Sequence, residues 1–187
     1  MRSSKGKKPF RVVSKRAAFR GYVSQLDVLQ IETASGRRVE RELIRHPGAV
    51  VIIPRKRDGR LILVRQLRVA TGKRIWEFPA GTLEKGESTI RCAARELQEE
   101  TGWKTGRLRQ VLEFFPTPGI STEKMYLFIA DNLQHTGVRD LDPDEELEVE
   151  SFSVSEVERM IRRRVIVDGK TILGFLFFRR FLNHERH

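Results

Sequence analysis

The sequence contains little of what would mark an exported, disulfide-bonded or membrane-embedded protein. Cys92 is the only cysteine among its 187 residues, which excludes an internal disulfide framework and any zinc site with several cysteine ligands. No apolar run approaches the roughly 18 to 20 residues that a membrane-spanning helix requires. The basic start is not followed by the apolar core of a secretory signal peptide. We therefore expect a cytoplasmic protein without a membrane partner, with room for one domain of ordinary size.

Acidic residues are too few to balance the basic ones. The chain has 36 Lys and Arg residues against 25 Asp and Glu residues, which gives a formal net charge of +11. Such an excess favours an anionic partner, whether a nucleotide, a nucleic acid or an acidic lipid. Residues 1–16 are rich in basic side chains and cannot bury a core, so we interpret them as a basic flexible tail. Binding of a polyanion by this tail is the alternative, and nucleic acid is the less favoured partner.

Patterns of apolar residues predict strands on both sides of a central helix. Alternation over residues 19–33 and 37–46 predicts a small N-terminal β element, to which we assign residues 17–45. Two β-branched runs, residues 49–54 and 61–68, flank an Asp-Gly turn and predict a hairpin of core strands that is covered on both faces. The remaining predicted elements are strands within 107–116 and 124–133, an acidic loop over 140–154, and helices over 155–164 and 169–183. Residues 46–187 are therefore expected to form a mixed α/β domain.

The central helix is predicted over residues 88–101, where the apolar period changes to that of a helix. Ser88 is a suitable N-cap and Gly102 a suitable C-terminal stop. The predicted apolar face consists of Ile90, Ala93, Ala94 and Leu97.

Three carboxylates are expected to converge on this helix. At about 100° per residue, Glu96 and Glu100 point within about 40° of each other, and Glu99 lies on the neighbouring edge. Left alone they would repel one another, so a cation is expected beside them. Mg²⁺ takes oxygen ligands, usually a few carboxylates with water and substrate phosphates, which makes this face a candidate magnesium site. The alternative is a solvated helix face on which Arg91 and Arg95 pair with the glutamates.

The spacing around these glutamates favours the metal site. The segment from Gly81 to Trp103 resembles the Nudix box: glycine, five residues, glutamate, seven residues, then Arg-Glu-apolar-X-Glu-Glu-X-Gly-apolar, matched at every specified position. The resemblance implies an α/β/α sandwich with a mixed sheet, and hydrolysis of nucleoside diphosphates linked to another group. It implies that a divalent metal, Mg²⁺ or Mn²⁺ in its place, is held by Glu96, Glu99 and Glu100. Structural support of the site is implied for Gly81, Glu87, Arg95 and Gly102, with Arg95 orienting the glutamates by salt bridges.

The flanking residues resemble those of ADP-ribose pyrophosphatases. They include His46-Pro47-Gly48-Ala49-Val50, Val64-Arg65-Gln66-Leu67-Arg68, Trp76-Glu77-Phe78-Pro79-Ala80-Gly81 and Pro116-Thr117-Pro118-Gly119. This resemblance implies a homodimer that exchanges its N-terminal strands, and a metal ligand at the backbone carbonyl of Ala80. It also implies substrate-binding roles: adenine stacking by Tyr22 and a polar contact by Arg41, both from the partner subunit, a contact by Arg68, and a place near the terminal ribose for Glu123. Packing is the alternative for Tyr22.

The general base is assigned by the same resemblance, which places it on a late acidic loop. Glu145 is the first candidate and Glu146 the second, and in other Nudix enzymes a box glutamate, here Glu99 or Glu96, takes this role. ADP-ribose would then give AMP and ribose 5-phosphate. Two alternatives remain: a Nudix hydrolase for another nucleotide sugar, a dinucleoside polyphosphate or a capped RNA, and a non-catalytic nucleotide- or RNA-binding module.

Overall fold

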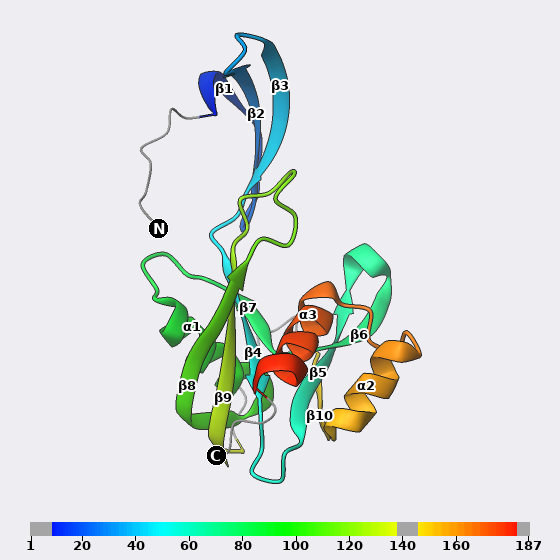
Figure 1. The fold of residues 1–187 in the computed structure, drawn as a ribbon. Helices are drawn as coiled ribbons and strands as arrows, with labels where there is room; N and C mark the ends of the chain where they lie inside the picture. The colour runs from blue at the N-terminus through cyan, green and yellow to red at the C-terminus, as the bar shows by residue number, and fades with distance from the viewer. Residues whose placement is uncertain (1–8, 138–145, 183–187) are drawn as a thin grey trace. The chain divides into compact units, whose positions relative to one another are not determined.

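The computed structural model describes residues 9–137 and 146–182. The chain divides into two compact units, which are described separately (Figure 1). Unit 1 comprises Met1–Pro47 and Thr117–Glu123, and unit 2 comprises Gly48–Pro116 and Lys124–His187. The division falls close to the predicted boundary at residue 45, but unit 1 also takes in a short segment from the middle of the sequence. Among the described residues, no helix is long and apolar enough to cross a membrane.

Unit 1 is a three-stranded antiparallel sheet in the order β1-β2-β3. Its strands are β1 (Phe10–Arg20), β2 (Gln25–Thr33) and β3 (Arg38–Arg45). The second segment of this unit joins β3, where Ile44 donates its N–H to the carbonyl of Ile120 at 2.8 Å and accepts a hydrogen bond from Thr122 at 2.9 Å.

Strand β1 corrects the prediction of a flexible tail over residues 1–16. The segment from Phe10 onward pairs with β2 through backbone hydrogen bonds, which do not depend on the charge of the side chains. Its basic residues also find partners across the pair, since Arg11 contacts Glu32 at 3.2 Å and Lys15 contacts Asp27 at 2.9 Å. The basic composition of this segment correctly predicted that its side chains lie in solvent, since every residue of β1 is exposed. A segment with solvated side chains can nevertheless form a strand.

Unit 2 contains two sheets, one of four strands in the order β7-β4-β9-β8 and one of three strands in the order β10-β5-β6. Within the first sheet β4 runs parallel to β9, and the other pairs are antiparallel. The strands are β4 (Ala49–Pro54), β5 (Leu61–Arg68), β6 (Lys73–Glu77), β7 (Ala80–Thr82), β8 (Trp103–Phe114), β9 (Met125–His135) and β10 (Glu148–Phe152).

The predicted hairpin between residues 49–54 and 61–68 is wrong. The turn forms, with Lys56 donating to Arg60 at 2.9 Å and Gly59 at φ +81°, but β4 and β5 then diverge into different sheets. Strand β4 and the first four residues of β5 are apolar on both faces, and each strand has two neighbours within its own sheet. Strand β4 lies between β7 and β9, and β5 lies between β10 and β6. Strand β10 likewise replaces the end of the predicted acidic loop, because Glu148 to Phe152 pair with β5.

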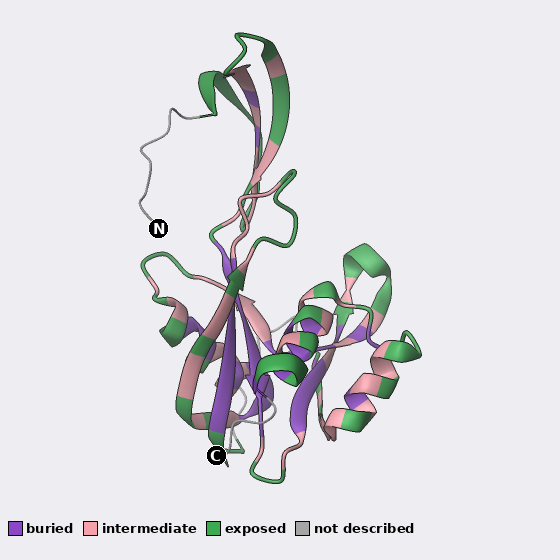
Figure 2. Cartoon of the chain, in the orientation of Figure 1, coloured by how far each residue is buried: buried purple, intermediate pink, exposed green. Residues whose placement is uncertain are grey.

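Helices cover both faces of the strands β4 and β9. They are α1 (Thr89–Thr101), α2 (Val154–Arg162) and α3 (Gly169–Phe177), with a short helical turn η1 (Val69–Thr71) and a π-helical extension η2 (Phe178–Leu182) after α3. One core cluster packs α1 against residues such as Val50 and Phe128, and the other packs α2 and α3 against Val51 and Leu127. Figure 2 shows β4 and most of β9 as buried. This arrangement is the predicted α/β/α sandwich. The predicted N-cap Ser88 is present on α1, and Asp168 caps α3.

Candidate active site

Helix α1 and the loop before it carry the predicted carboxylates. The helix begins after Ser88, whose side chain accepts from the N–H of Arg91, and ends at Gly102, whose φ of +73° lies in the left-handed region that favours glycine. Its buried residues are Cys92, Ala93, Leu97, Glu100 and Thr101. The predicted apolar face is therefore wrong in part: Ile90 and Ala94 are exposed, and the helix instead turns the carboxylate of Glu100 inward.

Arg95 forms ion pairs with three glutamates of the site, Glu87, Glu96 and Glu99. Its Nε and Nη2 atoms donate to the two carboxylate oxygens of Glu87, each at 3.0 Å. Its Nη1 atom lies 2.8 Å from Glu96 and 2.9 Å from Glu99. The hydrogen bond to Glu87 raises the pKa of Arg95, and Arg95 in turn lowers the pKa of Glu87, so both groups stay charged near neutral pH. Arg95 and Glu87 thus hold the positions that the resemblance implies for support of the site.

Glu96 and Glu100 lie against the backbone of β7. The N–H of Ala80 donates to Oε2 of Glu100 at 3.2 Å, and Glu100 is only 3% exposed. A Cβ atom added at Gly81 would lie 1.9 Å from the carboxylate carbon of Glu96, so any larger residue here would displace this carboxylate. The two glutamates and the Ala80-Gly81 segment therefore form one contiguous group, which includes the residue whose carbonyl was assigned to the metal.

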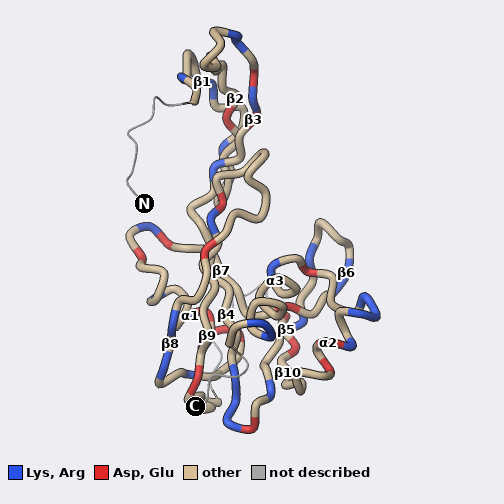
Figure 3. The backbone as a smooth tube through the Cα atoms, in the orientation of Figure 1, with Lys and Arg blue, Asp and Glu red and all other residues tan. Residues whose placement is uncertain are grey.

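The chemistry of this group fits a hard divalent cation. Every assigned ligand is an oxygen, and Mg²⁺ and Mn²⁺ prefer oxygen ligands. Figure 3 marks the acidic and basic positions along the backbone of the described residues. Among the described residues, no group of three His, Cys, Asp or Glu side chains is arranged to hold a metal ion. Glu96 and Glu99 are both paired with Arg95. A metal ion would therefore compete with Arg95 for these two carboxylates.

Arg68 is held by a buried carboxylate that the sequence analysis did not assign. Its Nε and Nη2 atoms donate to Glu77 at 2.8 and 2.6 Å, and Lys170 contacts the same carboxylate. The pKa of Arg68 is raised by Glu77 first and also by the charges of Glu100 and Asp168. Glu77 is the only charged residue between Trp76 and Gly81, and this feature of the sequence could have identified it as a candidate. No local signal identified Lys170.

The other predicted substrate residues belong to unit 1, whereas the carboxylates belong to unit 2. Tyr22 is fully exposed in the connection between β1 and β2, so packing within the chain does not account for it. Arg41 lies on β3 and donates to the carbonyl of Glu40 at 2.8 Å. Glu123 has an oxygen 4.0 Å from Nδ1 of His46.

The two loop candidates for the general base differ in how much is known of them. Glu145 lies outside the described residues. The side chain of Glu146 is 83% exposed and pairs with Arg74 of β6. Arg74 also lies 3.8 Å from Glu148, so one arginine of β6 pairs with both Glu146 and Glu148.

Comparisons with known proteins point to one family. A model of the NUDIX domain matches residues 45–172, which is more than half of the chain. An ADP-ribose pyrophosphatase of Bacillus subtilis (strain 168) is 35% identical over 162 residues, covering 86% of this chain and 88% of that protein. A methanol dehydrogenase activator of Bacillus methanolicus is 34% identical over 170 residues, covering 89% and 92%.

The fold has a match among solved structures. The crystal structure of an ADP compounds hydrolase superposes with a TM-score of 0.82, covering 96% of this chain and 97% of that one at 22% identity, which supports the fold. From the matched domain, the similar sequences and the arrangement of box residues on α1, we conclude that the chain belongs to the Nudix family and is a Nudix pyrophosphohydrolase.

Proposed function

We propose that the chain hydrolyses the diphosphate bond of ADP-ribose in a Mg²⁺-dependent reaction that releases AMP and ribose 5-phosphate. One observation carries the chemical part of this proposal: Glu96 and Glu100 lie against Ala80 and Gly81, next to an arginine that holds Glu96 and Glu99. The choice of ADP-ribose is supported by the name of the relative that is 35% identical over most of the chain.

The metal would be held by Glu96, Glu99, Glu100 and the carbonyl of Ala80. When bound, a divalent ion neutralises charge on the diphosphate oxygens and lowers the pKa of bound water. Arg95 keeps Glu96 and Glu99 on one side of the helix, and its own charge is fixed by Glu87. Gly81 leaves room for the Glu96 carboxylate, which any other residue would displace.

The reaction requires a base to take a proton from the attacking water. The water oxygen forms a bond to one phosphorus, the bond from that phosphorus to the bridging oxygen breaks, and the bridging oxygen leaves with the second phosphate. We assign the base to Glu145, with Glu146 next and Glu99 or Glu96 of the box as the alternative within α1. Glu146 is exposed and pairs with Arg74 of β6.

We also propose that two copies of the chain form a cytoplasmic homodimer, in which Tyr22 and Arg41 of one copy and Glu123 contribute to the substrate pocket. Unit 1 supports a dimer because it exposes apolar side chains that a second copy could cover. They are Phe10, Val12, Val13, Phe19, Tyr22 and Val23. The oligomeric state can be checked by light scattering on the purified chain.

A substrate panel tests the proposed activity. With Mg²⁺ present, we expect ADP-ribose to turn over at least about tenfold faster than GDP-mannose or diadenosine polyphosphates, a difference of about 1.4 kcal/mol in activation free energy. Faster turnover of one of the other substrates would move the assignment to that class of nucleotide. Replacing Mg²⁺ with Mn²⁺, and adding a chelator, tests the requirement for a divalent ion.

A non-catalytic binding module is the alternative from another class, and the basic N-terminus is the feature that favours it. Removal of residues 1–8 distinguishes the two, because it leaves β1 intact. A polyanion-binding module would lose affinity and salt dependence, whereas a hydrolase of a small nucleotide would keep its rate.

A further inference from the structure

A small cavity lies beside the C-terminal end of α1, where the chain enters β8. Its volume is about 260 Å³, and it is lined by Lys56, Arg57, Asp58, Trp103 and Leu133. All five residues belong to unit 2, and none of them has a role in the proposed hydrolysis. Pockets for drug-sized ligands usually have about 300 to 1,000 Å³, so this cavity suits one planar ring with a small polar group attached.

Trp103 and Leu133 form the apolar wall of this cavity. The Nudix box requires only an apolar residue at the position of Trp103, and the indole ring placed there is only partly buried. The N–H of Trp103 donates to Oγ1 of Thr101 at 3.2 Å, and Trp103 pairs with His135 across β8 and β9. The ring of His135 also packs against the indole, with the ring centroids 4.8 Å apart. An aromatic face that is held in this way can stack with a planar ring.

The polar wall of the cavity is the tight turn between β4 and β5. Lys56 donates its N–H to the carbonyl of Arg60 at 2.9 Å, and Gly59 donates to the carbonyl of Lys56 at 2.9 Å, so the turn is held by two backbone hydrogen bonds. The Nζ atom of Lys56 lies 5.7 Å from the centroid of the Trp103 ring. Positive charge therefore lies directly beside the aromatic face.

The charged side chains that line the cavity sum to +1. Lys56 and Arg57 contribute two positive charges, and Asp58 contributes one negative charge. Asp58 is engaged within the turn, since one of its oxygens accepts from the N–H of Arg60 at 3.0 Å and the other lies 3.9 Å from Lys56. Arg57 is exposed and has no ion-pair partner among the described residues. Its guanidinium group can therefore bind an anion, and the planar fork of this group matches phosphate oxygens.

We propose that this cavity is a nucleotide-binding site separate from the α1 carboxylates, in which a nucleobase stacks on Trp103 and the attached phosphate binds Arg57. A nucleotide combines the two groups that these walls select, a planar ring and an anion. Because its Nζ atom lies over the ring, the Lys56 side chain must be displaced by a stacking base, and its flexible stem can carry the ammonium group to the phosphate. The ligand is a nucleoside monophosphate, either free or as the terminal unit of an RNA strand.

Tryptophan fluorescence locates the bound ligand. The chain has two tryptophans, so Trp76→Phe leaves Trp103 as the only one. We expect AMP to quench the emission of Trp103 in this variant, because a stacked base contacts the indole directly. A chelator is present in all titrations, so that binding through a divalent ion does not contribute. Adenosine and inorganic phosphate each offer one of the two groups and should bind more weakly than AMP, and equal binding of phosphate and AMP would overturn the proposed stacking.

Two substitutions in the full chain test the two walls of the cavity. Trp103→Leu keeps an apolar side chain but removes the ring, and calorimetry should show AMP affinity at this site falling by about fivefold or more, the lower end of the range for loss of base stacking. Trp103→Phe should retain most of the affinity. Arg57→Met should weaken AMP binding by about fivefold and make it less dependent on salt, because one phosphate contact is lost.

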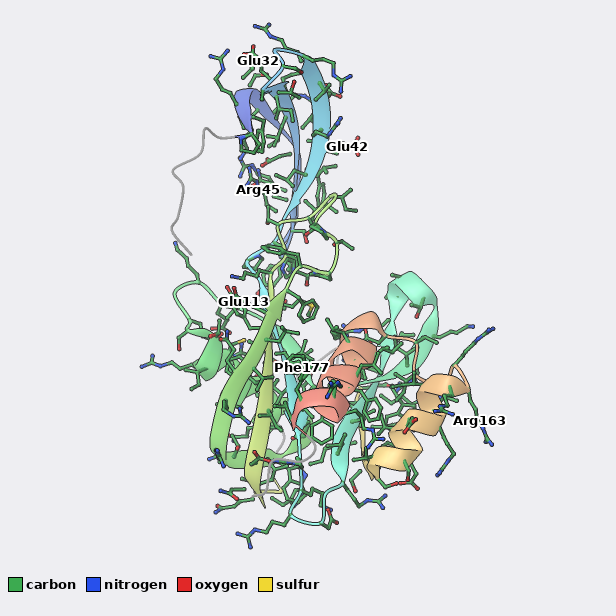
Figure 4. The ribbon with its side chains drawn as sticks, viewed as in Figure 1. Glu32, Glu42, Arg45, Glu113, Arg163 and Phe177 are labelled. Atoms are coloured by element: carbon green, nitrogen blue, oxygen red, sulfur yellow. The ribbon has the colours of Figure 1, made fainter. Side chains whose placement is uncertain are left out.

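Arg163→Met is the matched control for Arg57→Met. Arg163, which is labelled in Figure 4, is another exposed arginine of unit 2 without an ion-pair partner among the described residues. Its substitution changes the net charge of the chain by the same amount and should leave AMP binding unchanged. A thermal melt checks that each variant is folded. Arg57 lies in an exposed turn, so Arg57→Met tests the site even where Trp103→Leu lowers Tm.

A single-stranded oligoadenylate with a 5′-phosphate identifies the source of the nucleotide. Binding that is tighter than that of AMP and weakened by Trp103→Leu would assign the site to an RNA end, whereas equal affinity would assign it to mononucleotides, and both results uphold the proposal. The proposal is overturned if Trp103→Leu and Arg57→Met bind AMP as the wild type does, or if AMP leaves the emission of Trp103 unchanged. Failure to hydrolyse ADP-ribose with intact AMP binding at Trp103 would contradict the proposed function alone.

Discussion

The two units of this chain are stabilised in different ways. In unit 1, Asp27 and Leu29 are the only buried residues among those that the structure describes. Asp27 is held by Arg45 at 2.8 Å and by Lys15 at 2.9 Å, so an ion cluster occupies the middle of this sheet. Unit 2 has two apolar clusters that include fully buried strands, such as Val50 to Ile53.

Under the proposed function, unit 2 carries the chemistry and unit 1 the assembly of two copies. A rigid apolar framework can hold side chains in a fixed geometry, and the box carboxylates are attached to it through α1 and β7. A thin sheet with exposed apolar residues on β1 does not have enough core of its own and gains by being covered. Unit 2 therefore suits catalysis and unit 1 suits assembly, and the predictions that follow test this division from the largest expected effect to the smallest.

Glu100→Gln should cause the largest loss of hydrolytic activity among these variants. The amide oxygen can still accept the hydrogen bond from Ala80, so the fold of unit 2 is expected to remain, but one anionic ligand is removed. We expect the rate of Mg²⁺-dependent hydrolysis to fall by about 100-fold or more. Mutation of residues that only hydrogen-bond to metal ligands already lowers metal affinity or activity by about 10- to 100-fold. Steady-state kinetics and a thermal melt of the same sample check this. Undiminished turnover would refute the metal assignment.

The Nudix-box segment of unit 2 was predictable because its signals are local. The caps Ser88 and Gly102, and the spacing of Glu87, Arg95, Glu96, Glu99 and Glu100, lie within one short stretch of sequence. The contacts of Arg95 then follow from helix geometry and one preceding loop. The tilt of the helix on the sheet was not predictable in this way, so the exposure of Ile90 and the burial of Glu100 were missed.

The features that the sequence did not reveal depend on partners far apart in the chain. Strand β10 pairs with β5, and β4 pairs with β9 rather than with β5, so the hairpin prediction used the wrong neighbour. Lys170 meets Glu77 across 93 positions. Strand β1 was missed for a different reason, because its charged composition is typical of tails and only the pairing with β2 makes it a strand.

Replacing one buried leucine by alanine in each unit should show how much each core contributes to the free energy of unfolding. Leu97 on α1 is fully buried, and Leu97→Ala is expected to lower the free energy of unfolding by about 2 to 5 kcal/mol, the usual range for a core leucine. Leu29→Ala should cost less, because few apolar neighbours surround Leu29 and the sheet can relax. Urea unfolding followed by the fluorescence of Trp76 and Trp103, both in unit 2, should detect the first change and barely register the second. Equal costs would contradict the view that unit 2 holds the core.

Tyr22→Ala tests whether unit 1 takes part in substrate binding. Because Tyr22 is fully exposed, its removal should change the free energy of unfolding by less than about 0.5 kcal/mol. Loss of stacking on a base should nevertheless weaken ADP-ribose binding by about 1 to 3 kcal/mol, which appears as a higher KM with a similar kcat. Tyr22→Phe keeps the ring and is the matched control. An unchanged KM in Tyr22→Ala would contradict the assignment of Tyr22 to the substrate pocket.

The acid response of unit 1 should be the smallest effect. Arg45, with Lys15 and Gln25, lowers the pKa of Asp27 from 3.8 to about 2. A carboxyl whose folded-state pKa is depressed stabilises the fold above its unfolded pKa, and this contribution is lost as the pH falls from about 4 through 2. In Asp27→Asn, hydrogen exchange in β1, β2 and β3 should be faster than in the wild type at pH 5, and this gap should close toward pH 2. Glu32→Gln, which changes an exposed pair with Arg11 in the same sheet, is the control and should leave exchange near that of the wild type. A gap for Asp27→Asn that persists unchanged at pH 2 would show that the cluster acts through packing, and the contrast between a charge-held unit 1 and an apolar unit 2 would no longer hold.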